Sequence, residues 1–221
     1  MRRLLALVAL VALAAAPARD WTRAVTRTPA GATLIGNPAA RVKLVEYLSY
    51  TCPHCAHFTQ ESATTLRGAF VRSGSTSVEV RHFVIGGALD LSATVLARCA
   101  GPRFAVASDA IFARQEDWIR RGSDYAQANA DKLKALPTPQ VLRLLADGSG
   151  LTELVRAAVR LTPKSVDTCF ANKIDLDRVI AMTDAASKTV PGTPGFAING
   201  VFLGTTNWAA LQPQLRAAGA R

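Results

Sequence analysis

The sequence predicts an α/β fold in which a block of helices interrupts one β-sheet. Residues 42–87 show the pattern strand, helix, strand, and residues 195–218 show the pattern strand, strand, helix. Between them, residues 89–188 carry apolar side chains at helical spacing and no convincing strand. The two ends complete one sheet only if the intervening helices fold aside as a subdomain of their own.

Residues 1–18 are typical of a secretory signal peptide, which is not part of the fold. Arg2 and Arg3 precede the uncharged apolar run Leu4–Ala16, which is too short to span a bilayer comfortably. A small-x-small pattern follows, so we expect cleavage after Ala18; the alternative is an uncleaved N-terminal anchor. Export places the protein in the periplasm, an oxidising compartment where disulfides persist.

The composition indicates a globular protein. The chain has 221 residues, of which 49% are hydrophobic and 19% charged, and this excludes a disordered chain. The net charge of +10 comes from basic residues interleaved with acidic ones, as on a solvated surface, so we expect no nucleic-acid partner. Four cysteines are too few for a disulfide scaffold.

The first half of the sheet is expected around residues 42–48 (VKLVEYL), which are apolar on both faces and therefore predict a central buried strand. Residues 33–35 predict a short edge strand. A helix is expected from Pro53, which the first helical position tolerates, to about Val71. Residues 78–84 predict the next strand.

The helical block begins with a face that carries Leu91, Val95 and Cys99. Thr138 and Thr162 each precede a proline and predict helix N-caps. The remaining expected elements are helices at 104–112, 138–148, 162–170 and 176–183, a hairpin of strands 195–198 and 201–203, and a helix at 208–218. We therefore expect one domain from residues 19–87 and 189–221, with a helical insertion at 88–188.

The chemistry is expected at Cys52-Pro53-His54-Cys55. Two cysteines three residues apart on a first helical turn lie on the same side, within reach of a disulfide. The free N–H groups and the dipole of a helix N-terminus stabilise a thiolate, so the pKa of Cys52 should be low. His54 can add a hydrogen bond or positive charge. We expect Cys52 to be exposed and Cys55, one turn inward, to be the shielded resolving thiol.

Three other interpretations of the motif compete. It can be a purely structural disulfide. It can be half of a zinc site with His54 or His57, although structural zinc usually needs a second ligand pair at a distance. A c-type haem site is excluded because Ala56, not histidine, follows the second cysteine. We expect no metal and no cofactor.

Two further residues favour a redox site. Glu46 lies in an apolar strand six residues before Cys52, where a buried carboxylate can relay the proton that Cys55 must lose. The alternative is an acid exposed at the sheet edge. Pro194 abuts the strand at 195–198 and is the better candidate for a cis proline; the alternative is a trans proline in an ordinary loop.

The strand VKLVEYLSYT leading into CPHC, the acid Glu46 and the segment GTPGFAING resemble the thioredoxin superfamily, and within it the DsbA-like thiol:disulfide oxidoreductases. The resemblance covers nearly the whole chain after residue 18. It implies a thioredoxin fold with an inserted all-helical domain. It also implies that the protein oxidises secreted proteins and is recycled by a membrane redox partner of the DsbB type.

The resemblance assigns roles to individual residues. Cys52 is the nucleophile, Cys55 the resolving thiol and His54 the thiolate stabiliser. Pro194 is the cis proline facing the disulfide, and Thr193 touches the substrate backbone; Pro53 completes the expected substrate surface. Thr193 replaces the aliphatic residue common in the best-known oxidases, which leaves the oxidising strength open.

The remaining cysteines, Cys99 and Cys169, fall on apolar helical faces. In an exported protein two such cysteines are more often paired than free, so we expect a structural disulfide; two buried free thiols are the alternative.

Three functions stay open: a thiol oxidase, a disulfide isomerase or reductase, and a thiol-dependent chaperone or binding module. Residues 19–41 leave no room for the dimerisation domain of dimeric isomerases, so we favour a monomeric oxidase acting on reduced secreted proteins.

Overall fold

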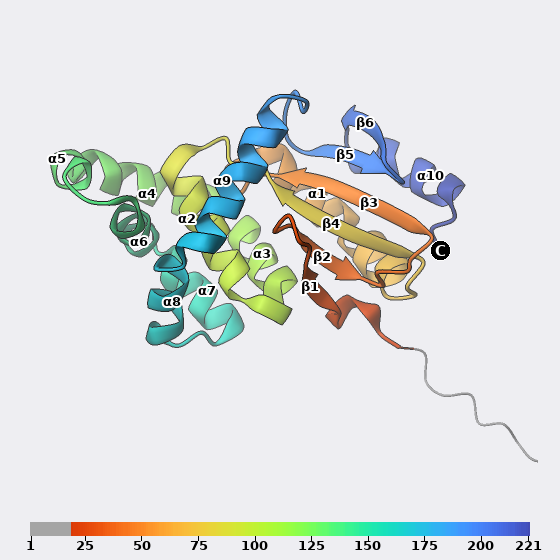
Figure 1. Ribbon diagram of the computed structural model, residues 1–221, viewed down its shortest axis with the longest axis horizontal. Coiled ribbons are helices and arrows are strands. Elements are labelled where there is room, and N and C mark those ends of the chain that lie inside the picture. The colour runs from red at the N-terminus through yellow and green to blue at the C-terminus, as the bar shows by residue number, and fades with distance from the viewer. Residues whose placement is uncertain (1–18) are drawn as a thin grey trace, which may run out of the picture.

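The fold is built around β3 (Val42–Leu48), the strand expected at the centre of the sheet. The computed structural model describes residues 19–221, so the expected signal peptide lies outside the described residues. The sheet has six strands in the order β1-β2-β4-β3-β5-β6 (Figure 1). β3 pairs in parallel with β4 and antiparallel with β5, so it is central as expected. Burial on both faces is not observed, because Val42, Leu44 and Leu48 are buried on one face whereas Val45 and Tyr47 on the other are only partly buried. The other strands are β1 (Val25–Arg27), β2 (Thr33–Gly36), β4 (Thr76–His82), β5 (Gly195–Ile198) and β6 (Val201–Thr205).

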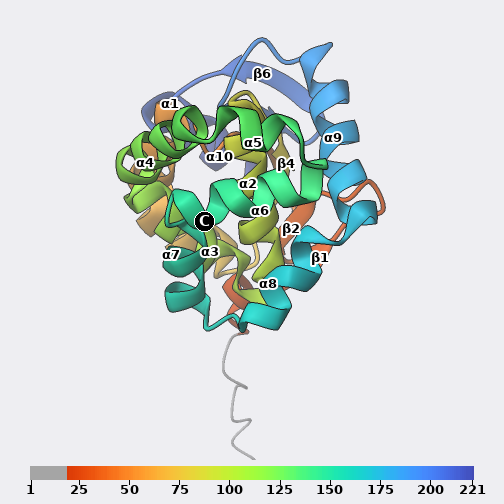
Figure 2. The ribbon, with the colours of Figure 1, turned by 90° about the vertical axis from the view of Figure 1, so that its left-hand side faces the viewer.

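The helices fall into two groups (Figures 1 and 2). One group belongs to the β-containing ends: α1 (Pro53–Ser62), the π-helical turns η2 (Ala63–Val71) and α10 (Trp208–Ala218), besides the short 3-10 turn η1 (Trp21–Arg23). The other group forms the inserted block. Its elements are α2 (Gly87–Cys99), η3 (Gly101–Arg103), α3 (Phe104–Ala113), α4 (Gln115–Ala128), α5 (Ala130–Lys134), α6 (Thr138–Gly148), α7 (Leu151–Val159), α8 (Pro163–Phe170) and α9 (Lys173–Ser187).

Several local expectations need correction. The segment at 33–35 is not an edge strand, because β1 pairs outside it in antiparallel register. The helix expected at 53–71 is α-helical only to Ser62 and continues as π-helix. Thr162 caps α8 by accepting from the Ser165 N–H, as expected, but the N-cap of α6 is Pro137 rather than Thr138.

One hydrophobic core runs through the sheet and the inserted block. It joins Leu44 of β3 and Phe70 of η2 to Leu96 of α2, Ile111 of α3 and Val155 of α7. The block gathers at one end of the sheet, where α3 packs against α1 and α9 against β4 (Figure 1). Within residues 19–221, no helix is both long and apolar enough to cross a membrane.

Candidate active site

The Cys52-Pro53-His54-Cys55 motif lies where the central strand passes into α1. Cys52 is the N-cap residue of that helix, with an extended backbone (φ −82°, ψ 118°), and Pro53 follows in the first turn. Proline fits there because the first-turn N–H groups have no intrahelical acceptor in any case. The His54 and Cys55 N–H groups of that turn favour an anion on the Cys52 sulfur.

Both cysteines of the motif are free thiols, and both are buried. Cys55 is fully buried, as expected, but Cys52 is only 4% exposed, so the expectation that it is exposed is wrong. The cover comes from the loop before β5. There the Thr193–Pro194 peptide bond is cis, and the Thr193 carbonyl oxygen accepts a hydrogen bond from Cys52 Sγ at 3.1 Å.

The two thiols differ widely in acidity. A hydrogen bond from the Cys55 thiol lowers the pKa of Cys52 to about 5, with help from the Thr193 side chain and from the backbone N–H groups of Cys55 and His54, against the opposing effect of burial. Burial raises the pKa of Cys55 well above its usual range, and the neighbouring Cys52 raises it further. At neutral pH the pair therefore consists of a thiolate and a thiol.

Thr193 presents two different groups to this pair. Its carbonyl accepts from the Cys52 thiol, whereas its hydroxyl is buried and has no hydrogen-bond partner among the described residues. The Thr193 side chain nevertheless lowers the pKa of Cys52, because its hydroxyl is a potential donor to the thiolate. One residue thus supports Cys52 in both protonation states.

An open groove of about 590 Å³ runs beside the cysteines. Its lining includes His54 and His57 from α1, Thr193 and Pro194 from the cis-proline loop, and Asn207, the N-cap of α10. The His54 side chain is exposed in this groove, and the contribution of His54 to the low pKa of Cys52 comes from its backbone N–H. The structure therefore brings His54, Thr193 and Pro194 together around Cys52.

Glu46 is 6% exposed and lies on the central strand, so the alternative of an acid exposed at the sheet edge is wrong. Burial raises the pKa of its carboxyl to about 7, although the positive charge of Arg67 opposes the rise. The Glu46 charge also acts on Cys55, whose pKa it helps to raise. A carboxyl with a pKa of about 7 exchanges protons readily near neutral pH.

Asp90, which the sequence reasoning did not single out, holds the segment just before Cys52. This α2 residue is fully buried and accepts five hydrogen bonds. The donors are the hydroxyls of Ser49 and Thr51 and the backbone N–H groups of Tyr50, Ile85 and Gly86. An acid among the apolar residues of an expected helix was the only sequence signal for it.

Gln115 holds the same segment from a second helix of the inserted block, and no sequence signal marks it. Its side-chain nitrogen donates to the carbonyl of Tyr50 at 2.8 Å and to that of Cys52 at 2.9 Å. Gln115 opens α4 and is 7% exposed. The inserted block therefore fixes the backbone of the redox motif through side chains from two helices.

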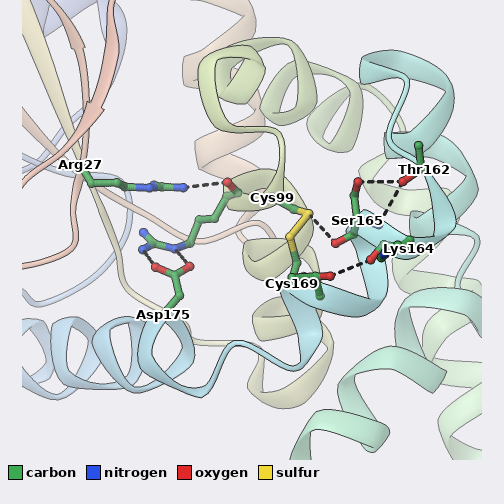
Figure 3. The surroundings of a disulfide bond; sticks show 9 residues. Arg27, Cys99, Thr162, Lys164, Ser165, Cys169 and Asp175 are labelled. Atoms are coloured by element: carbon green, nitrogen blue, oxygen red, sulfur yellow. Dashed lines mark hydrogen bonds and ion pairs between the residues drawn. A yellow bond between two sulfur atoms is a disulfide. The ribbon is translucent and has the colours of Figure 1, made fainter.

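Cys99 and Cys169 form a disulfide with an S–S distance of 2.06 Å, between the end of α2 and α8 (Figure 3). Beside it, Arg27 donates to the Arg98 carbonyl and Arg98 pairs with Asp175 of α9, which ties β1 and α9 to α2. These two cysteines are thus not available as ligands to a metal at Cys52. In the part of the chain that is described, no group of His, Cys, Asp or Glu is arranged to hold a metal ion.

The chain belongs to the thioredoxin family, because the family described as Thioredoxin matches residues 28–217. Its fold is the DsbA-like form, a thioredoxin fold with a helical insertion, as the resemblance predicts. Among solved structures, protein-disulfide isomerase from Novosphingobium aromaticivorans is 34% identical, with a TM-score of 0.73, over 83% of this chain and 95% of that one. Wolbachia pipientis alpha-DsbA1 shares the fold at 19% identity, with a TM-score of 0.64, over 85% of this chain and 90% of that one.

Curated relatives carry a related name. A protein of Rickettsia conorii named "Putative protein-disulfide oxidoreductase" is 29% identical over 175 residues, which are 77% of this chain and 54% of that protein. The chain thus spans about half the length of the curated relatives it matches.

Proposed function

We propose that this protein is a periplasmic thiol:disulfide oxidoreductase that donates the Cys52–Cys55 disulfide to secreted proteins. The observation that carries the proposal is the difference in acidity within the pair, with a pKa of about 5 for Cys52 and one well above the usual range for Cys55. A stabilised thiolate favours the reduced form of the pair and makes its disulfide a strong oxidant.

The transfer takes place in two exchanges. A substrate thiolate attacks Cys52 Sγ, the Cys52–Cys55 bond breaks, and a mixed disulfide forms between the substrate and Cys52. Cys55 leaves as a thiolate of high basicity and takes up a proton. We assign Glu46 as the donor of that proton. A second substrate thiolate then attacks the substrate sulfur and expels Cys52, whose low pKa makes it a good leaving group. The substrate gains a disulfide and the enzyme pair gains two electrons.

The reverse step uses the same groups. When a mixed disulfide stalls, Cys55 attacks Cys52 Sγ to release the substrate, and it must first lose its proton. Glu46, with a pKa of about 7, accepts that proton near neutral pH. Reoxidation requires a disulfide partner that takes the two electrons, and we propose a membrane protein of the DsbB type.

The groove beside the cysteines is the proposed substrate site. Its open floor receives an extended segment of a reduced protein, while Thr193 and Pro194 lie against the reacting sulfur. Pro53 is exposed at the start of α1 and extends this surface. The Cys99–Cys169 disulfide is consistent with an oxidising compartment, and we propose that the mature protein acts there as a monomer.

The decisive test is the redox equilibrium of the Cys52–Cys55 pair with glutathione, combined with oxidation of reduced ribonuclease. We expect an oxidising equilibrium and stoichiometric disulfide donation, both abolished in Cys52→Ser. The variant Cys99→Ala/Cys169→Ala is the matched control, because it removes the other pair and should keep the activity. A glutathione equilibrium as reducing as that of an ordinary structural disulfide would contradict the proposal.

A second candidate function is disulfide isomerisation, favoured by the name of the Novosphingobium aromaticivorans protein and by Thr193 before the cis proline. The two activities separate when reduced and scrambled ribonuclease are refolded in parallel. Efficient rescue of the scrambled enzyme, with little activity on the reduced one, would assign the chain to isomerases.

A further inference from the structure

A small cavity of about 50 Å³ lies beneath the central strand on the side of α1 and α3. Glu46 lines it, and so does Asp109 of α3. One carboxylate oxygen of each residue, Glu46 Oε1 and Asp109 Oδ1, is buried without a hydrogen-bond partner in the described part of the chain. A cavity with more than about 15 Å³ of accessible volume holds an ordered water where at least two polar groups reach it, and the two unpaired carboxylate oxygens are such groups.

An ion pair stands between this cavity and the surface. Arg67 Nη1 of η2 donates to Asp109 Oδ2 at 2.7 Å, and the two side chains are 26% and 44% exposed. Both residues also line an open groove of about 650 Å³ on the outside of the molecule. The pair therefore has one side toward Glu46 and the other toward solvent.

The surroundings of Glu46 are otherwise mostly apolar. Its sheet neighbours are Val80 on β4 and Phe196 on β5, and Phe58 of α1 lines the same cavity. The uncharged hydroxyls in the lining are those of Thr59, Ser62 and Ser108. Among residues 19–221, the charged or titratable groups facing Glu46 are Arg67 on η2, Asp109 on α3, Cys55 on α1 and the Tyr50 hydroxyl.

We propose that Arg67 and Asp109 are positioning residues for the proton site at Glu46, and that water in the cavity links the Glu46 carboxyl to solvent across this ion pair. The inference rests on the proposed function, in which Glu46 exchanges a proton with Cys55. It adds the outer half of the proton path and names the two residues that set how tightly Glu46 holds its proton.

The proton balance requires such an outer path. Two substrate thiols lose two protons when their disulfide forms, and both are released into solvent as the substrate thiolates form. One proton returns to Cys55, because Cys55 ends as a thiol whereas Cys52 remains a thiolate. Glu46 gives that proton to Cys55 and takes up another from solvent, on the side of the ion pair that lines the groove of about 650 Å³. Each substrate disulfide therefore moves one proton inward past the ion pair.

The test uses the opposite charges of the pair. In Asp109→Asn the Arg67 charge is no longer neutralised, so it stabilises the Glu46 carboxylate and the protonation midpoint of Glu46 moves to lower pH. In Arg67→Met the cation is lost while Asp109 stays negative, so the midpoint moves to higher pH. Because the pair is partly exposed, we expect shifts of about half a pH unit or more in each direction. The double variant should return toward the parent.

The readout is the infrared carbonyl band of a protonated carboxyl, followed against pH in the full reduced protein and assigned by its loss in Glu46→Gln. The pH profile of Cys55 attack on a Cys52 mixed disulfide should move with it. Arg143→Gln and Asp147→Asn on α6 are the matched control, since they break an ion pair whose residues do not line the cavity. Arg67→Lys keeps the charge and should stay near the parent even if Arg67→Met fails to fold.

Each outcome decides one claim. Shifts of the same sign, or no shift in either variant, would overturn the role of Arg67 and Asp109 while leaving Glu46 in place. If Glu46→Gln leaves the rate of Cys55 attack unchanged, the proposed proton transfer from Cys55 to Glu46 is wrong. Even then, the infrared midpoints of Asp109→Asn and Arg67→Met determine whether the ion pair sets the pH at which Glu46 is protonated.

Discussion

Two buried carboxyls flank the redox motif, and they differ in one respect. Burial raises the pKa of both Asp90 and Glu46. Asp90, however, accepts five hydrogen bonds that fix the segment before Cys52, whereas one oxygen of Glu46 has no partner within residues 19–221. Hydrogen bonds offset part of the desolvation of the Asp90 carboxylate, whereas no hydrogen bond opposes the rise in the pKa of Glu46.

The difference separates a structural acid from a chemical one. The five donors to Asp90 tie it to the backbone and hydroxyls around the segment before Cys52, so a change in its protonation would break structural contacts. A carboxyl with an unpaired oxygen can gain or lose a proton without breaking a hydrogen bond at that oxygen. Glu46 does so at small free-energy cost near its pKa, which is about 7. Natural sequences tolerate such an unsupported group where it has a function.

Replacing Asp90 with alanine should have the largest effect. The change leaves the N–H groups of Tyr50, Ile85 and Gly86 and two hydroxyls without their acceptor, so we expect a loss of about 3–5 kcal/mol in the free energy of unfolding. Urea denaturation of the disulfide-intact protein measures it. Asp124→Ala, an exposed acid on α4, is the control and should change stability little. Equal losses of unfolding free energy in both variants would contradict a structural role for Asp90.

Replacing Glu46 with glutamine should stabilise the protein, the opposite of the Asp90 effect. The pKa of Glu46 is raised from 4.5 to about 7, so the folded chain holds this proton more tightly than the unfolded chain does. Stability of the parent therefore falls as pH rises from about 4.5 to about 7, and the full cost, on the order of 3 kcal/mol, is present above pH 7.

Thermal unfolding at pH 8 and pH 4 tests this sign. Glu46→Gln should unfold at a higher temperature than the parent at pH 8, and its advantage should vanish toward pH 4. At pH 8 the same variant should release mixed disulfides more slowly, because Cys55 loses its proton acceptor. A variant that is less stable than the parent at pH 8 would show that Glu46 is a structural acid like Asp90.

The residues that could be predicted from sequence carry local signals. Cys52, Cys55 and Glu46 stand out because a strand, a helix start and a spacing of a few residues define their surroundings. The contacts of Gln115 with Tyr50 and Cys52 join residues 65 and 63 positions apart, so only the packing of α4 reveals them. The burial of Cys52 was missed for the same reason, since its cover comes from Thr193, 141 positions away.

The fold shows the same limit. The central strand and the terminal helix were predicted at their observed bounds because their apolar patterns are strong. β1 has three residues, too few for a pattern, and its existence depends on pairing with β2. The change from α-helix to π-helix after Ser62 is also absent from the apolar spacing.

Replacing Gln115 with methionine tests whether the inserted block holds the redox motif as firmly from α4 as from α2. Methionine keeps the length of the side chain but donates to neither the Tyr50 nor the Cys52 carbonyl. We expect a loss of about 1–3 kcal/mol in the free energy of unfolding, smaller than for Asp90 because fewer hydrogen bonds are lost. Faster hydrogen exchange confined to residues 50–56 should accompany it; uniform loss of protection across the chain would contradict a local role.

Replacing Thr193 with valine should have the smallest effect, and it tests how Cys52 is supported when neither acid is altered. Valine has nearly the shape of threonine but no hydroxyl, so the Cys52 thiolate loses one donor while the Thr193 carbonyl contact of the thiol form stays. The pKa of Cys52 should rise from about 5 by roughly 0.7 of a unit, since a net hydrogen bond of about 1 kcal/mol corresponds to that shift. Thiolate absorbance of the reduced protein against pH measures it, and the glutathione equilibrium should move toward a weaker oxidant by the corresponding factor.

Thr205→Val, in the same groove, is the control for a lost hydroxyl away from the sulfur. If Thr193→Val leaves the titration of Cys52 unchanged, the helix N-terminus and Cys55 alone account for its acidity, and the buried hydroxyl of Thr193 faces the substrate instead.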